Sequence, residues 1–298
     1  MGKRLEMAVA ALNGAVGDYL ARTGNGLATE MAFVKDGAPL AVTRAGLAAA
    51  FPDATSRAVV LVPGLMCSES IWQMPDGDDY GTLLARDLGF TPLYARYNTG
   101  LSIPDNGARL AALLEALVGA WPAPLDELLP LGFSMGGLVV RSACHAATLE
   151  GHGWLKLVRR AIYVGTPHHG APLERIGRVV ARVLAAVPDP YTRLAAQLGD
   201  MRSEGVKDLG DAHPVPLLDG IRHYLVAGSL STDPRLAALF GDAMVPMGSG
   251  TNGLAQARGT RALPPGHVKV VAGVGHIALA HDPHVYAQIR EWCEKEPS

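Results

Sequence analysis

The chain has 298 residues, of which 49% are hydrophobic and 18% charged, a composition typical of a globular protein with a core of ample size. Its net charge of −2 excludes a global basic field of the kind that holds nucleic acid or an anionic membrane. Its apolar runs stay below the roughly 18 residues that span a bilayer, so no transmembrane segment is expected.

The N-terminus begins as a signal peptide does, with basic residues ahead of an apolar stretch. Glu6 and Asn13 interrupt that stretch, which continues at helical spacing, so the pattern favours an amphipathic helix over a cleaved signal. The cysteines Cys67, Cys144 and Cys293 are odd in number and lack metal-type spacing, which indicates free thiols in a reducing compartment. We therefore expect a cytoplasmic protein.

Strands and helices are predicted to alternate along most of the chain. Residues 1–50 indicate one or two helices, with room for a short hairpin, ahead of the main sheet. Apolar, β-branched runs predict strands at 58–62, 91–97, 128–133, within 155–165, at 221–228 and at 267–273. Helices are predicted over 108–120, 135–149 and 282–294. Such alternation indicates an α/β fold, with a mostly parallel sheet and helices on both faces.

Residues 171–218 break this alternation, because they contain no strand pattern. Within them, residues 176–187 place their apolar side chains on one face of a helix. The sequence predicts an insertion between two core strands that covers the top of the sheet, where loops after parallel strands place active sites. The pattern leaves open whether this helix is a moving lid or packs permanently on the domain.

A nucleophile elbow is predicted at Gly132-Phe133-Ser134-Met135-Gly136, which matches G-x-S-x-G. An apolar strand runs into this motif and a helix of small residues leaves it. The tight turn would make larger side chains two positions before and after the serine collide, and glycine removes that collision. The helix that begins at Met135 points its positive end at Ser134. The alternative is a serine that caps an ordinary strand–helix turn.

Several segments resemble, in order, motifs of bacterial lipases and esterases of the α/β-hydrolase family, especially the group related to the GPI inositol-deacylase: LVPGL (61–65), GFSMGGLVVRSA (132–143), VGTPHHGAPL (164–173), GDAMVP (241–246) and GVGH (273–276). The resemblance covers about residues 58–296. It implies an α/β-hydrolase domain over residues 51–298, preceded by an N-terminal helical extension over 1–50, with 171–218 as a helical lid insertion.

The general base is predicted to be His276. In this fold the triad follows the chain order serine, acid, histidine. Of the ten histidines, only His276, His281 and His284 follow the last predicted strand. His276 lies three residues after Gly273, at the top of the sheet, whereas His281 and His284 fall toward the final helix and are expected to be solvated.

The acid is expected between Ser134 and His276, in the loop after the strand at 221–228. Asp242 lies in GDAMVP, which is similar to the segment that carries the acid in this lipase group. Asp233 precedes a proline and is typical of a helix N-cap. We therefore predict Asp242 as the acid, with Asp233 as the alternative.

The oxyanion hole requires two backbone N–H donors. Met135, directly after the nucleophile, is one, and the resemblance implies Leu65 as the other. The family often has His-Gly-apolar at this loop, where this chain has Pro63-Gly64-Leu65, so a side chain that often braces the loop is missing. The family's histidine before the nucleophile is replaced by Phe133, a change expected to affect packing only.

The paired histidines of TPHHG, His168 and His169, could suggest a metal. No carboxylate or cysteine stands beside them at ligand spacing, so a structural role near the site is expected for His168 and no metal is predicted. Trp72 and Phe133 are candidates for the acyl pocket, although plain core positions are the simpler interpretation.

These observations predict a serine hydrolase that cleaves carboxylic esters, an esterase or lipase, through an acyl-enzyme on Ser134. The expected substrate is a small-molecule acyl ester or lipid, and no cofactor is required. A thioesterase, amidase or acyltransferase could use the same triad, and fold and triad cannot separate them. A non-catalytic binding protein with this fold is a further alternative. The natural substrate and the oligomeric state are not indicated by the sequence.

Overall fold

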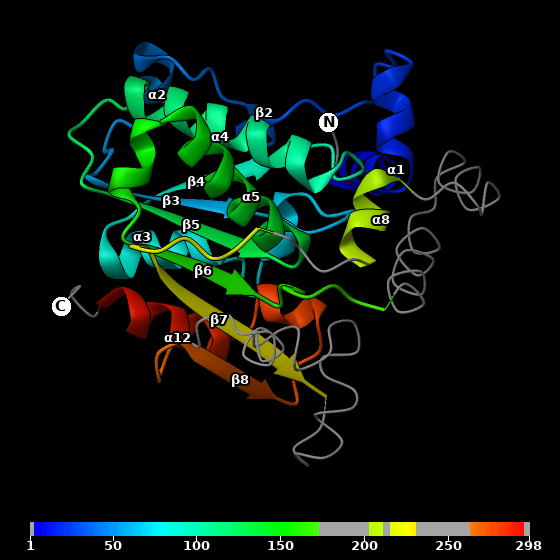
Figure 1. Cartoon of the computed structure of the whole chain (residues 1–298). Helices are drawn as coiled ribbons and strands as arrows, with labels where there is room; N and C mark the ends of the chain where they lie inside the picture. The colour runs from blue at the N-terminus through cyan, green and yellow to red at the C-terminus, as the bar shows by residue number, and fades with distance from the viewer. Residues whose placement is uncertain (1–2, 173–202, 211–214, 231–262, 295–298) are drawn as a thin grey trace.

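The computed structural model describes residues 3–172, 203–210, 215–230 and 263–294. Their strands form one sheet in the order β2-β1-β4-β3-β5-β6-β7-β8 (Figure 1). The strands are β1 (Ala32–Lys35), β2 (Ala38–Pro39), β3 (Arg57–Val62), β4 (Thr91–Arg96), β5 (Glu127–Phe133), β6 (Arg160–Val164), β7 (Arg222–Ser229) and β8 (Val268–Ala272). The six strands β3 to β8 run parallel to one another, whereas β1 is antiparallel to both of its neighbours, β2 and β4.

The predicted α/β architecture is confirmed. Each of the six predicted strands is present, and the hairpin suggested within residues 1–50 is β1 and β2, which extend the main sheet at one edge. The division into an extension over 1–50 and a domain over 51–298 stays a prediction. Within the described ranges, no helix is both long and apolar enough to cross a bilayer.

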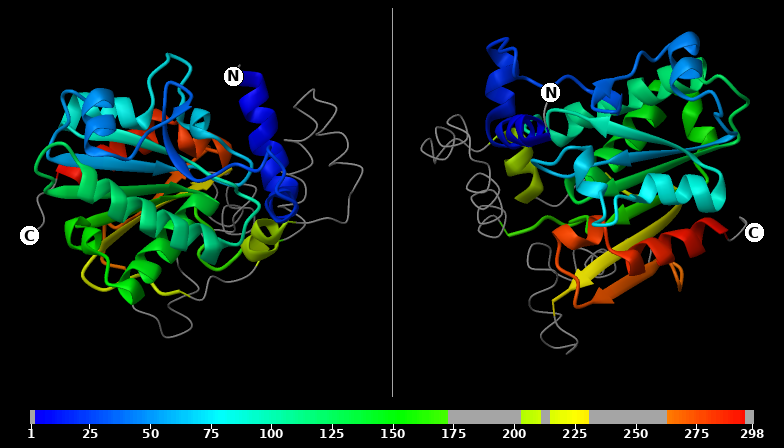
Figure 2. Two further views of the ribbon diagram at one scale, coloured as in Figure 1. Left: turned by 90° about the horizontal axis from the view of Figure 1, so that it is seen from above. Right: turned by 180° about the vertical axis from the view of Figure 1, so that it is seen from behind.

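Helices cover both faces of the sheet (Figures 1 and 2). They are α1 (Lys3–Arg22), α2 (Arg44–Ala50), α3 (Tyr80–Leu88), α4 (Ile103–Ala120), α5 (Met135–Glu150), α8 (Glu204–Gly210) and α12 (Pro283–Glu294), with the 3-10 turns η1 (Glu69–Trp72), η2 (Gly153–Leu157) and η3 (Ile277–Ala280). The side chains of β3 alternate between two cores. Val60 and Val62 pack with α1, α4 and α5, whereas Val59 and Leu61 pack with α3 and α12. Because β3 is buried on both faces, its sequence is an almost continuous apolar run and does not alternate between apolar and polar residues.

α4 and α3 differ from the sequence expectation. α4 begins at Ile103, five residues earlier than predicted, because Ser102 caps it by accepting the N–H of Asp105. α3 was not predicted at all. Its signals are the capping box of Asp79 with Thr82 and the glycine that ends the helix in the left-handed conformation, which sequence analysis overlooked.

The described part of the predicted insertion lies beside the carboxyl end of the sheet. It includes α8, which contacts α1 and α4, and the Asp208 carboxylate accepts the N–H of Ile103 at 2.8 Å. The predicted helix over 176–187 lies outside the described residues, so its role as a lid stays a prediction. α1 stands at this same end of the sheet, whereas α12 ends at the opposite end (Figures 1 and 2).

Candidate active site

The backbone at Ser134 has the geometry of a strained turn. Ser134 joins β5 to α5 with φ 52° and ψ −124°, a conformation that non-glycine residues rarely adopt. Its N–H donates to the carbonyl of Val164 at 2.8 Å, and its own carbonyl accepts the N–H of Gly137 at 3.1 Å. Neighbouring elements on both sides therefore hold the serine in this conformation.

The glycines of the motif are required by close approach. A Cβ at Gly132 would lie 2.5 Å from the Cα of Gly137, and a Cβ at Gly136 would lie 2.2 Å from the carbonyl oxygen of Val62. Real Cβ atoms essentially never make contacts this short. The steric reason given above for the G-x-S-x-G pattern is therefore present in the structure.

The structure brings Ser134 and His276 together. The Nε2 atom of His276 lies 2.9 Å from the Oγ atom of Ser134, and both side chains are buried. His276 follows β8 and directly precedes η3. Sequence analysis selected it from chain order and from its place three residues after Gly273.

Packing fixes the plane of the His276 ring. The ring centroid of Phe133 is 5.1 Å away, and a Cβ at Gly165 would lie 3.2 Å from the ring's Cε1. Behind Phe133, the ring of Trp72 packs edge-on at 6.1 Å. Trp72 and Phe133 are both fully buried in one apolar cluster, so they are core residues, and Phe133 additionally supports the imidazole.

Of the remaining candidates for the triad, the structure describes the two histidines but not the two acids. Asp242 and its alternative Asp233 both lie outside the described residues, so the acid stays a prediction. His284 is exposed, as expected, with 85% of its side chain accessible to solvent. His281 is not simply solvated, because its Nδ1 lies 3.1 Å from the carbonyl oxygen of Ile71.

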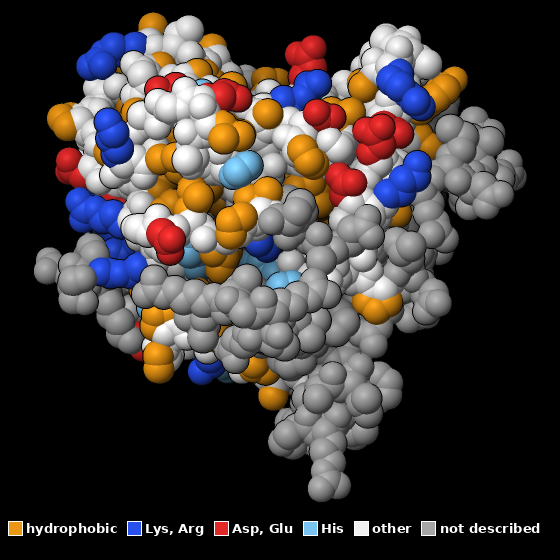
Figure 3. Space-filling view, viewed as in Figure 1, with side chains coloured by type: hydrophobic (Ala, Val, Ile, Leu, Met, Phe, Trp, Pro, Cys, Tyr) orange, Lys and Arg blue, Asp and Glu red, His pale blue; other side chains and the backbone are white. Residues whose placement is uncertain are grey.

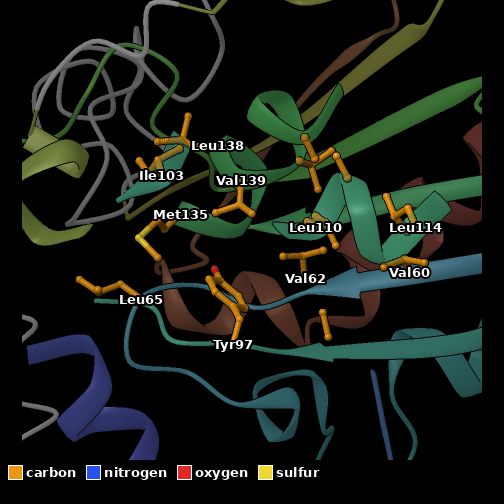
Figure 4. Packing of buried hydrophobic residues seen from close by; sticks show 14 of the residues in the cluster. Val60, Val62, Leu65, Tyr97, Ile103, Leu110, Leu114, Met135, Leu138 and Val139 are labelled. Carbon is orange, nitrogen blue, oxygen red and sulfur yellow. The ribbon is translucent and has the colours of Figure 1, made fainter. Parts of the chain in front are cut away.

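Residues 63–66, here called the oxyanion loop after the role predicted for Leu65, lie against Ser134. A Cβ at Gly64 would be 2.9 Å from the Cβ of Ser134. The side chains of Leu65 and Met135 are neighbours at this end of the sheet (Figure 4) and belong to one buried cluster. Neither backbone N–H is hydrogen-bonded within the described residues.

The loop after β4 braces the oxyanion loop. The hydroxyl of Tyr97 donates to the carbonyl of Pro63 at 2.7 Å, and the hydroxyl of Thr99 accepts the N–H of Met66 at 3.1 Å. Met66 is itself in the left-handed region, with φ 61°. These contacts support a loop that has a proline where the lipases resembled by the sequence often have a histidine. Sequence analysis missed Tyr97 and Thr99, whose one available signal was their place after a neighbouring parallel strand.

His168 has the structural role expected of it. Its Nδ1 lies 2.9 Å from the Nη1 of Arg141, a buried residue of α5 that also donates to the carbonyl of Val215. Burial lowers the pKa of Arg141. Arg141, which sequence analysis did not single out, thus links α5 to the chain just before the predicted insertion and to the insertion's last residues. Within the described ranges, no three metal-binding side chains are grouped together.

No protein-family model matches the chain, and no curated protein matches it in sequence. Solved structures do share its fold. The mature lipase BlEst2 of Bacillus licheniformis aligns with a TM-score of 0.50 at 20% identity, over 79% of this chain and 91% of that chain. The propeptide form of the same lipase aligns with a TM-score of 0.51 at 19% identity, over 82% of this chain and 51% of that one.

A protein of Listeria innocua, the product of gene lin2722, aligns with a TM-score of 0.50 at 15% identity, over 81% of this chain and 95% of that chain. At these identities the likeness concerns the fold alone. Together with the mostly parallel sheet and the turn at Ser134, it confirms the predicted architecture: the chain has the α/β-hydrolase fold.

Proposed function

We propose that the protein is a serine hydrolase that cleaves carboxylic esters through an acyl-enzyme on Ser134. The observation that carries this proposal is the 2.9 Å contact between Ser134 Oγ and His276 Nε2 on a strained strand–helix turn. A serine hydroxyl is a weak nucleophile at neutral pH and needs an adjacent base to take its proton. The pair supplies both groups within hydrogen-bond reach.

In the first half of the proposed reaction, Ser134 Oγ attacks the ester carbonyl carbon while His276 Nε2 takes the hydroxyl proton. The carbonyl oxygen becomes an oxyanion, which accepts hydrogen bonds from the N–H groups of Leu65 and Met135. The positive end of α5 favours the same negative charge. His276 then gives its proton to the leaving alcohol, and the acyl group stays on Ser134.

In the second half, water replaces the alcohol. His276 takes a proton from the water, the resulting hydroxide attacks the acyl carbon, and the returned proton regenerates the Ser134 hydroxyl. We propose that Asp242 accepts a hydrogen bond from the imidazole and stabilises its protonated form, with Asp233 as the alternative acid. These steps use only side chains and backbone of the chain, and they call for no cofactor.

We propose an uncharged acyl ester, small or lipid, as the substrate. Phe133 and Met135, which flank Ser134 in the chain, and Leu65, in the loop beside it, all have uncharged side chains that are buried. On the face shown in Figure 3, acidic and basic side chains of the described residues are interspersed and form no patch of one sign. A strongly charged substrate would therefore find no matching field on that face.

Fluorophosphonate labelling combined with a substrate panel tests the proposal. Wild-type protein should be labelled on Ser134 and should hydrolyse p-nitrophenyl esters, with chain-length preference read from a short-to-long series. Ser142→Ala, in the same helix but away from the turn, is the matched control and should behave as wild type. Absence of both labelling and turnover in the wild type would leave a non-catalytic binding protein. Faster turnover of thioesters or amides than of esters would overturn the ester assignment.

The acid is tested by comparing Asp242→Asn with Asp233→Asn. Loss of the triad carboxylate lowers kcat by about 10⁴-fold, because the imidazole loses its orientation and its stabilising charge. We expect that loss for Asp242→Asn and an almost unchanged rate for Asp233→Asn. The reverse result would move the acid to Asp233 and leave the proposed reaction class intact.

A further inference from the structure

The N-terminal helix α1 lies directly on the oxyanion loop. A Cβ at Gly14 would be 2.3 Å from the Cγ of Met66 and 3.0 Å from its backbone N. Any residue larger than glycine at this position would therefore displace Met66. Met66 is the residue that directly follows Leu65, the proposed oxyanion donor.

A second contact joins α1 to the loop after β4. The side-chain amide of Asn98 donates to the carbonyl of Gly17 at 2.8 Å and accepts the N–H of Gly100 at 3.0 Å. A Cβ at Gly17 would lie 1.8 Å from Asn98 Oδ1, and a Cβ at Gly100 would lie 2.1 Å from the carbonyl oxygen of Asn13. Backbone therefore packs on backbone across this interface, which leaves it little freedom to shift.

α1 is fixed in this place by buried polar contacts. Asn13 is fully buried, and its side chain accepts the N–H of Thr29 at 2.9 Å while donating to the carbonyl of Leu27 at 2.8 Å. The hydroxyl of Ser203 donates to the carbonyl of Gly14 at 2.7 Å. The helix is kinked at Val16, with φ −140° and ψ 23°, between the two glycines that touch the loops.

We propose that α1 is a positioning element of the oxyanion hole. The inference rests on the proposed function, because it concerns the same N–H of Leu65. Met66 holds a left-handed conformation that costs a non-glycine residue free energy, so the surroundings must maintain it. Thr99 holds its N–H from one side, and the glycine face of α1 confines its side chain from the other.

The catalytic consequence follows from how strictly oxyanion donors must be placed. Removal of one donor lowers kcat by about 10²- to 10³-fold, and a site must be held within roughly 0.5 Å of its productive geometry. A displaced Met66 shifts the Leu65–Met66 peptide and, through the Cα of Leu65, moves the N–H of Leu65 as well. Gly14 and Gly17 are therefore positioning residues, which act through Met66 and Asn98 and touch no substrate.

Gly14→Ala tests the inference. We expect kcat on p-nitrophenyl butyrate to fall by roughly 10- to 100-fold with KM nearly unchanged, because the oxyanion forms only in the transition state. The affinity for a trifluoromethyl ketone, whose adduct places an oxyanion in the same hole, should fall by a similar factor. Gly119→Ala in α4 is the matched control, since a Cβ there meets nothing within 4 Å.

A double-variant cycle adds a readout that a general loss of stability would not produce. Met66→Ala removes the Cγ atom that a Cβ at Gly14 would strike. The double variant Gly14→Ala/Met66→Ala should therefore regain kcat up to the level of Met66→Ala alone, so the two effects are not additive. If Gly14→Ala does not fold, Met66→Ala alone decides: it removes the contact without overpacking and should still lower kcat at constant KM.

The outcomes separate this inference from the proposed function. A wild type that neither reacts with a fluorophosphonate nor turns over esters would overturn the proposed function, and this inference with it. A working wild type, with kcat and inhibitor affinity in Gly14→Ala equal to those in Gly119→Ala, would overturn this inference alone. Equal losses in kcat for the single and double variants would overturn it as well.

Discussion

The two ends of the central sheet are built by different means. At the amino ends of the strands, the carboxylate of Glu127 pairs with Arg57 at 2.9 Å and with Arg160 at 3.0 Å. Glu127 and Arg160 each expose only 3% of the side chain. The strands β3, β5 and β6 therefore begin at a buried group of paired charges.

At the carboxyl ends of the same strands, the features are neutral side chains and unusual backbone. Ser134 and Met66 both have positive φ, and His276 lies beside the serine hydroxyl. Strained backbone persists only where the surrounding structure determines it strongly. We infer that the paired charges stabilise the sheet at one end, whereas the strained backbone at the other end serves the proposed reaction.

Ser134→Ala should show the difference between the two ends most clearly, because it should change activity and leave stability nearly unchanged. We expect a loss of roughly 10³-fold or more in kcat, because the nucleophile is gone. Thermal unfolding should be almost unchanged, since alanine differs only by the hydroxyl and keeps the same turn. Ester turnover and a melting curve on the same preparation provide the test. Retention of more than a tenth of the wild-type rate would place the nucleophile elsewhere.

Glu127→Ala should produce the opposite result. Removing one partner from a buried ion pair leaves an uncompensated charge and costs about 3–5 kcal/mol of stability. We expect urea unfolding to show this loss while kcat per folded molecule stays near the wild-type value. Glu294→Ala breaks an exposed pair with Arg290 and serves as the control, with an effect below about 1 kcal/mol. A stable Glu127→Ala protein with reduced kcat would contradict this inference about the two ends.

Sequence patterns predicted the features that are local. The strands follow from runs such as the one in β3, and the turn at Ser134 follows from the glycines that flank it. His276 could be chosen because chain order in the fold restricts the base to the region after the last strand.

The supports of the site could not be predicted in the same way. Asn98 and Gly17 are 81 positions apart, and Tyr97 and Pro63 are 34 apart, so only the folded topology brings each pair together. Nothing in an amphipathic N-terminal pattern indicates which loop the helix contacts. The missed α3 is different, because Asp79 and the glycine that ends the helix were readable signals.

Acid should destabilise the fold through a histidine that lies outside the proposed triad. Burial lowers the pKa of His223 from 6.5 to about 4, and the nearby Arg141 and His267 act in the same direction. The hydroxyl of Tyr163 at 3.0 Å from Nδ1, and the carbonyl of Leu218 at 2.8 Å from Nε2, suit the neutral ring. Below its ordinary pKa, the unfolded chain therefore binds a proton that the folded chain does not.

The free energy of unfolding should fall by about 1–3 kcal/mol from this group as the pH drops from near 6.5 to near 4. Urea unfolding at several pH values measures the slope. His223→Gln should flatten it in this window, whereas His284→Gln, at an exposed position, should not. An unchanged slope in His223→Gln would assign the acid sensitivity to other groups.

Tyr97→Phe should give the smallest effect, and it bears on how the oxyanion loop is held. The variant keeps the ring in the core and removes only the hydroxyl that donates to the carbonyl of Pro63. Losing one such hydrogen bond costs about 1 kcal/mol of stability. Because Thr99 and α1 still hold Met66, we expect kcat to fall by less than about 10-fold, less than in Gly14→Ala.

The pH dependence of the same variant sharpens this prediction. Burial holds the pKa of Tyr97 well above its ordinary value, so the hydroxyl remains a neutral donor across the working range. The ratio of the wild-type kcat to that of Tyr97→Phe should therefore stay constant between about pH 6 and 9. A ratio that changes with pH would mean that Tyr97 influences a titrating group of the reaction. A loss larger than that of Gly14→Ala would instead make the loop after β4, and not α1, the main support of the oxyanion loop.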